Sequence, residues 1–235
     1  MTAKEIVAEL QTLGNESYKQ ILLKHGAQEP IFGVKVEDLK KIQKRIKKDY
    51  RLALELYDTG ISDAMYLAGL IADDAKMTKE NLERWVKKAN SPLHSEYTVP
   101  WVAAGSPSGP ELAQKWIDSK EENIAAAGWA TLSSWVAITE DADLDQKQLK
   151  QLLERVQKSI HQAPNRVRMM MNGFVIAVGT YVEPLHDLAK KTAAQIDRVS
   201  VFVGDTACKV PFAPDYINKA KLQGKVGRKR KSAKC

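Results

Sequence analysis

The chain has 235 residues, of which 44% are hydrophobic, and it carries a formal net charge of +7. A chain of this size can bury one sizeable core. It contains no apolar run of about 18 residues, the length of a membrane-spanning helix, and residues 1–14 are amphipathic, so we expect neither a membrane span nor a secretion signal. The two cysteines, Cys208 and Cys235, suit a reducing compartment better than a disulfide framework. We therefore expect a cytoplasmic protein.

Apolar residues recur at helical spacing from one end of the chain to the other, and the alternation typical of strands is almost absent. In residues 36–48, Leu39, Ile42 and Ile46 form one apolar stripe, while lysines occupy the other faces. This pattern predicts a surface helix with a basic exterior.

Three later segments are apolar on most sides and predict inner helices; they are residues 63–73, 123–136 and 166–178. Amphipathic segments, which predict surface helices, alternate with them at residues 79–90, 109–119, 145–160 and 184–196. Residues 95–100 are a polar stretch broken by Pro100 and are not among the predicted helices.

Helix pairs recur at about 30 to 40 residues, the range of HEAT-like repeats. The small residues Ala125, Ala126, Ala127, Gly128 and Ala130 suit such a stack, because helices that cross closely need short side chains. We therefore predict an all-α solenoid of stacked antiparallel helix pairs, which curves and presents a concave face. An irregular helical bundle is the alternative.

The positive charge is concentrated at the C-terminus. Residues 219–235 contain eight Lys or Arg residues and no acid, which leaves 28 bases against 29 acids in the rest of the chain. We expect one domain over residues 1–218, followed by a basic, flexible tail over residues 219–235. Such a tail suits a polyanion, because lysines and arginines that neutralise phosphates release counterions. A solvated tail that only keeps the protein in solution is the alternative.

The common metal, cofactor and catalytic motifs are missing from the sequence. The four histidines are scattered, neither cysteine has a partner at the short spacing of metal ligands, and the glycines form no phosphate-binding loop. We expect no metal and no cofactor.

Several aromatic and basic residues are candidates for nucleic-acid contacts. Tyr97, Trp101 and Trp129 fall in or near inner segments, where an aromatic face could stack on a base or fill the core. Arg166 and Arg168 begin an otherwise apolar helix and could clamp phosphates, although solvated arginines in a first helical turn are common.

The run from Phe32 to Ile42 (FGVKVEDLKKI), together with the helical repeat pattern and the small-residue inner helices, resembles the AlkD-like branch of the DNA alkylation repair proteins. The resemblance covers residues 16–196, and residues 204–211 and 227–235 are similar to features of a sub-branch with a basic tail. It implies a HEAT-like solenoid whose concave, positively charged face holds duplex DNA. The family includes glycosylases that release alkylated purines in base excision repair.

The resemblance weakens at the positions that carry catalysis. Leu93 and Tyr97 fall where active members have a tryptophan and an aspartate, and Gly128 falls where they have an arginine. An aromatic residue of the family corresponds to a position near Phe174. Glu96, one position from Tyr97, is the candidate for a displaced catalytic carboxylate.

We therefore predict a DNA-binding protein of the alkylation repair family, either a divergent DNA glycosylase or a binder without excision. Its expected DNA contacts are Tyr97, Trp101, Trp129, Arg166, Arg168, Lys225, Arg228, Lys229, Arg230 and Lys231. The alternative is a non-catalytic scaffold that binds a protein partner or another nucleic acid on the same concave surface. Phosphate contacts alone do not distinguish DNA from RNA.

Overall fold

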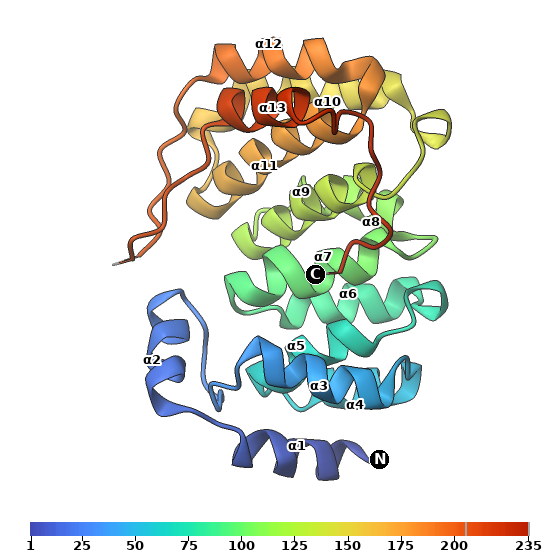
Figure 1. Cartoon of the computed structure of the whole chain (residues 1–235), viewed down its shortest axis with the longest axis vertical. Helices are drawn as coiled ribbons and strands as arrows, with labels where there is room; N and C mark the ends of the chain where they lie inside the picture. Colours follow the sequence, from blue (N-terminus) through green and yellow to red (C-terminus); the bar gives the residue numbers. More distant parts are fainter. Residues whose placement is uncertain (205, 235) are drawn as a thin grey trace.

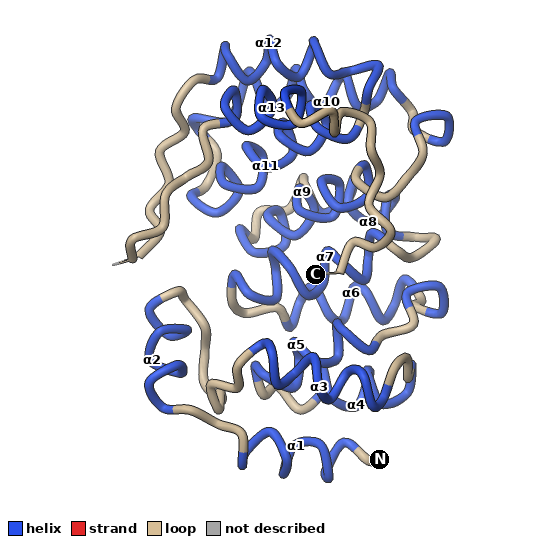
Figure 2. The backbone as a smooth tube through the Cα atoms, in the orientation of Figure 1, coloured by secondary structure: helices blue, strands red, loops and turns tan. Residues whose placement is uncertain are grey.

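The structure, a computed structural model, describes residues 1–204 and 206–234, and within them it contains helices but no strands (Figures 1 and 2). The predicted all-α architecture is confirmed. The α-helices are α1 (Ala3–Thr12), α2 (Glu16–Lys24), α3 (Val36–Ile46), α4 (Tyr50–Asp58), α5 (Ser62–Ile71), α6 (Lys79–Lys88), α7 (Val99–Ala104), α8 (Gly109–Trp116), α9 (Glu122–Val136), α10 (Gln146–Ser159), α11 (Asn165–Tyr181), α12 (His186–Ile196) and α13 (Ala213–Leu222).

The three predicted inner helices are α5, α9 and α11. Every residue of α5 is buried, because its apolar side chains point in all directions and neighbouring helices cover each face. Gly128 explains how closely the stack packs: a Cβ atom added there would lie 2.7 Å from the backbone nitrogen of Ile117. The helices α3, α6, α10 and α12 bury one apolar stripe each and expose their charged faces.

A fourth inner helix includes residues 95–100, a polar stretch in which the sequence pattern predicts no helix. Residues His94–Thr98 form a π-helical turn, which continues into α7. Pro100, which has no backbone N–H to donate, directly follows this π turn, where the regular helical hydrogen-bond ladder is interrupted. This π turn carries Glu96 and Tyr97. Among the described residues, no helix is both long and apolar enough to cross a membrane.

The C-terminal segment differs from the expected flexible tail. Helix α13 runs across the predicted boundary at residues 218 and 219, and residues 225–234 then pass over the stack towards α7 (Figure 1). The Gly227 N–H donates to Thr180 O at 3.0 Å and the Arg230 N–H donates to Ala137 O at 2.7 Å. Ala233 is buried against the N-terminal hydrophobic cluster.

Two lysines of this segment, Lys229 and Lys234, bind the C-terminal ends of inner helices. Lys229 donates to Val136 O (3.0 Å) at the end of α9 and to Tyr181 O (2.7 Å) at the end of α11, and it pairs with Asp141. Lys234 donates to Ala72 O (2.8 Å), just after α5. Terminal helix carbonyls lack partners within the helix and carry partial negative charge, so they attract cations. The prediction of a flexible tail is therefore wrong, because helix-end carbonyls bind the lysines of the segment.

Candidate functional site

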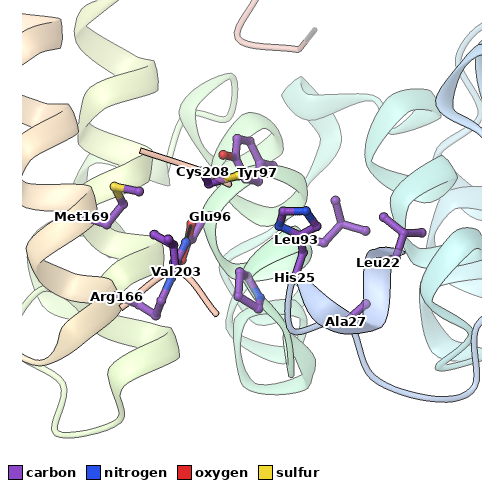
Figure 3. A pocket seen from close by; sticks show the side chains of 11 residues that line it. Leu22, His25, Ala27, Leu93, Glu96, Tyr97, Arg166, Met169, Val203 and Cys208 are labelled. Carbon is purple, nitrogen blue, oxygen red and sulfur yellow. Dashed lines mark hydrogen bonds and ion pairs between the residues drawn. The ribbon is translucent and has the colours of Figure 1, made fainter. Parts of the chain in front are cut away.

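A cavity of 260 Å³ opens where the N-terminal end of α11 faces the π turn and the end of α2 (Figure 3). Its lining residues come from four parts of the chain: Leu22, His25, Ala27, Pro92, Leu93, Glu96, Tyr97, Arg166, Met169, Val203 and Cys208. The structure thus brings together three of the predicted site residues, Glu96, Tyr97 and Arg166.

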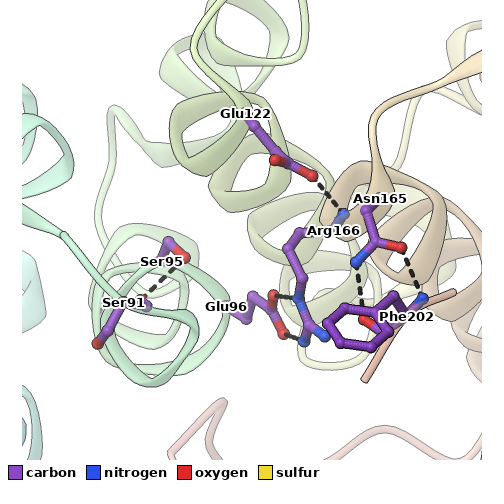
Figure 4. A network of polar contacts seen from close by, with 7 residues as sticks. All are labelled: Ser91, Ser95, Glu96, Glu122, Asn165, Arg166 and Phe202. Carbon is purple, nitrogen blue, oxygen red and sulfur yellow. Dashed lines mark hydrogen bonds and ion pairs between the residues drawn. The ribbon is translucent and has the colours of Figure 1, made fainter. Parts of the chain in front are cut away.

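Glu96 and Arg166 form a bidentate ion pair in this cavity (Figure 4). Arg166 donates from Nε to Oε1 of Glu96 at 2.5 Å and from Nη2 to Oε2 at 2.6 Å. The side chain of Glu96 is 0% exposed and that of Arg166 is 26% exposed. Each carboxylate oxygen therefore already accepts a hydrogen bond from a charged donor.

The surroundings of Glu96 act on its charge in opposite directions. Burial raises the pKa of Glu96, and the nearby Glu122 carboxylate adds to that effect, whereas the hydrogen bonds and charge of Arg166 lower it. The Glu96 hydrogen bonds raise the pKa of Arg166 further above its already high ordinary value. The ion pair with Arg166 compensates for the desolvation cost of the buried Glu96 carboxylate.

Polar contacts fix the N-terminal end of α11 around this pair (Figure 4). The backbone N–H of Arg166 donates to Oε1 of Glu122 at 2.5 Å, so a side chain from the first turn of α9 caps α11. The Asn165 side chain exchanges two hydrogen bonds with the backbone of Phe202, each 2.7 Å long. Glu122 and Asn165 therefore position the guanidinium that holds Glu96, and sequence reasoning identified neither of them.

The three predicted aromatic contacts lie in different surroundings. Tyr97 is 48% exposed at the cavity and packs edge-to-face on Trp101, with ring centroids 6.0 Å apart. Trp101 is 7% exposed, so its ring lies in the interior and contacts Tyr97 there. Trp129 is 1% exposed and packs against Phe174, which leaves no open indole face. The prediction that Trp129 contacts DNA is therefore corrected: it is a core residue.

The predicted basic contacts divide between two ends of the inner helices. Arg166 lines the 260 Å³ cavity, whereas Arg168, half-buried on α11, does not. Lys225, Arg228, Lys229 and Arg230 surround a second cavity at the other end of α11, and Lys231 lines a third beside α5. Lys229 is corrected as a DNA contact, because its side chain is 8% exposed and its ammonium group is fully engaged.

Two residues of the cavity had no sequence signal, His25 and Cys208. Cys208 is exposed and near Tyr97, and no disulfide within the described residues involves it; Cys235 lies outside those residues. Within the part of the chain that the structure describes, no three His, Cys, Asp or Glu side chains converge on a point where a metal ion could bind.

Stacked helix pairs with largely buried inner helices, and a cavity at the N-terminal end of α11, define a HEAT-like helical-repeat protein. The family model of the DNA alkylation repair enzymes matches residues 6–197. The chain belongs to this family.

Relatives match over nearly the whole length of the chain. The uncharacterized protein Lin0241 of Listeria innocua is 34% identical over 94% of this chain and 98% of its own. The uncharacterized protein Lmo0209 of Listeria monocytogenes is 33% identical over 96% and 100%. A solved structure, from a new family of proteins related to the HEAT-like repeat DNA glycosylases with affinity for branched DNA structures, is 35% identical with a TM-score of 0.91 and full coverage of both chains.

The structure also shows what occupies the positions where the resemblance weakens. Leu93 and Tyr97 both line the cavity. Gly128 is packed so closely against Ile117 that an arginine has no room there. Arg166, from a later helix, is the arginine that reaches the cavity, and it points at Glu96 (Figure 3).

Proposed function

We propose that this protein binds DNA, prefers branched DNA to a linear duplex, and does not excise bases. Membership of the DNA alkylation repair family supports DNA as the partner. The preference for branches is supported by the relative with affinity for branched DNA structures, which is 35% identical over the full length of the chain.

The observation that carries the absence of excision is the bidentate pairing of Glu96 with Arg166. Breaking a glycosidic bond builds positive charge on the sugar, which a glycosylase stabilises with a free carboxylate oxygen or with a water that the carboxylate orients. Glu96 has both oxygens engaged and no exposed surface. Tyr97 does not replace it, because a phenol is neutral near pH 7 and burial raises the pKa of Tyr97 further.

Aromatic and basic residues at the two ends of α11 suit DNA binding without catalysis. Tyr97 presents an exposed aromatic face beside the cavity, and the exposed cations Lys225, Arg228 and Arg230 suit phosphate contacts. A branched DNA has more than one arm, so one arm can contact the cavity at the N-terminal end of α11 while another contacts the cations at its C-terminal end. A linear duplex offers one arm only.

The test combines excision and binding assays on the full chain. Methylated duplex DNA is incubated with the protein and released bases are followed by chromatography, beside an active alkylpurine glycosylase as positive control. We expect no release. Binding of a three-way junction and of a linear duplex with the same arm sequence is compared by fluorescence anisotropy, and we expect tighter binding of the junction.

Three results would contradict the proposal. Release of methylated purines by the wild type that disappears in Glu96→Gln would make Glu96 a catalytic carboxylate despite its ion pair. Equal affinity for junction and linear duplex would remove the preference for branches. Absence of binding to either DNA would favour the protein-scaffold alternative.

A further inference from the structure

A second cavity, of 510 Å³, lies between the C-terminal half of α11, helix α13 and the C-terminal segment. Five of its lining residues are cationic and none is acidic: Lys219, Lys225, Arg228, Lys229 and Arg230. Ile176 and Ala220 add an apolar surface. The folded C-terminal segment itself forms one wall, so the cavity exists because Lys229 holds that segment in place.

Four of these cations are available to a ligand. Lys229 is satisfied by Asp141 and two backbone carbonyls. Lys219, Lys225, Arg228 and Arg230 are exposed, and no ion pair among the described residues involves them. A cluster of like charges around one cavity, without acids in its lining, favours an anionic ligand.

Two tyrosines give the cavity a second chemical character. Tyr216 on α13 is 52% exposed, and Tyr181 at the end of α11 lines the cavity with it. Aromatic faces beside cations form the combination that binds single-stranded nucleic acid, in which bases stack on the rings while lysines and arginines contact the phosphates.

We propose that this cavity binds an unpaired segment of DNA, with Tyr216 as the stacking platform and Lys219, Lys225, Arg228 and Arg230 as phosphate contacts. The inference deepens the proposed function and rests on it, because unpaired nucleotides occur at the branch points of DNA. A base inside a duplex is stacked on both sides and has no free face for Tyr216, so the ligand is single-stranded.

The position of the cavity suits a branched ligand. The first cavity contacts α11 through Arg166 and Met169, and the second contacts the same helix through Ile176, Thr180 and Tyr181. At 1.5 Å per residue the centres of the two groups are about 17 Å apart along the helix. One DNA molecule with a duplex arm and an unpaired arm can therefore reach both.

The experiment measures binding of a fluorescein-labelled oligodeoxythymidylate of about 10 nucleotides, the span of one single-strand site, and of a linear duplex. We expect Tyr216→Ala to weaken binding of the single strand about 5- to 150-fold, the range for loss of one stacked base, and to leave duplex binding unchanged. Tyr216→Phe keeps the ring and should bind like the wild type. Leu222→Ala, on the exposed end of the same helix and outside the cavity, is the matched control.

Wild-type single-strand affinity in Tyr216→Ala would overturn the inference, as would equal losses for single strand and duplex. Thermal unfolding of each variant separates loss of binding from loss of fold. If the wild type prefers the junction but binds no single strand, this inference fails and the proposed function stands. If it binds the single strand but does not distinguish junction from linear duplex, the preference for branches fails and this site stands.

Discussion

At the scale of single residues, the ion pair between Glu96 and Arg166 gives the candidate site its properties, and it can be tested by removing one partner. Arg166→Met leaves a carboxylate with 0% side-chain exposure and no counter-charge. Because Arg166 keeps 26% exposure, we expect a loss near the lower end of the range for a broken buried pair, about 3 kcal/mol in the free energy of unfolding at pH 7. Urea denaturation measures it.

The pH dependence identifies the charge of Glu96 as the cause. Without Arg166, burial and the nearby Glu122 raise the pKa of Glu96 above its ordinary 4.5. A group with a raised folded-state pKa contributes stability below its unfolded pKa and loses it as the pH rises through the folded pKa. The deficit of Arg166→Met should therefore shrink as the pH falls towards 4.5. In Glu96→Gln/Arg166→Met the deficit should be small at every pH; a pH-independent deficit in the single variant would contradict this account.

The sequence predicted part of this site. Tyr97 and Arg166 were identified from their residue types and Glu96 from the family resemblance, and the structure places all three in one cavity. Their pairing was not predictable, because Glu96 and Arg166 are 70 positions apart and only the stacking of α11 beside the π turn brings them together. Trp129 was misplaced for a related reason. An aromatic residue on an inner helix can face the groove or the neighbouring helix, and the sequence around it does not distinguish the two directions.

At the scale of elements, the inner helices were predicted because a continuous apolar run has one stable location, the interior. The π turn and α7 were missed because polar residues and a proline usually end a helix, whereas here Pro100 directly follows a π turn, where the regular hydrogen-bond ladder is already interrupted. The C-terminal segment was predicted from its charge alone. Its binding partners, the carbonyls of Val136 and Tyr181, are backbone groups, which no side-chain pattern reveals.

Lys229 is the residue on which the fold of the C-terminal segment depends. Its ammonium group makes three hydrogen bonds at 8% side-chain exposure. Lys229→Met keeps the aliphatic chain but leaves two helix ends and Asp141 without their cation. We expect a loss of about 2 to 3 kcal/mol, as for a hydrogen bond to a charged group, together with faster proteolysis after residue 224. Lys231→Met, at an exposed position of the same segment, should behave like the wild type, and equal stability of the two variants would contradict the role of Lys229.

At the scale of the whole molecule, the positive charge that the sequence concentrates at the C-terminus becomes part of a surface. The ammonium groups of Lys229 and Lys234 form the ion pairs and hydrogen bonds that hold the segment against the helix ends. The exposed Lys225, Arg228 and Arg230 are consequently held in fixed positions beside α11 and α13. One segment thus contains two kinds of cation, one for folding and one free for a polyanion.

This division predicts how DNA affinity depends on salt. Replacing Lys225, Arg228 and Arg230 together by glutamine leaves Lys229 and the fold of the segment intact, so we expect unchanged unfolding. If all three contact phosphates, the slope of log affinity against log salt concentration should become shallower by about 2 to 3, since each contact contributes about 0.7 on a single strand and about 0.9 on a duplex. Anisotropy titrations of a three-way junction over a series of salt concentrations measure the slope. An unchanged slope with a normally folded variant would mean that DNA lies elsewhere on the stack, and that the fixed cations of the C-terminal segment serve another polyanion.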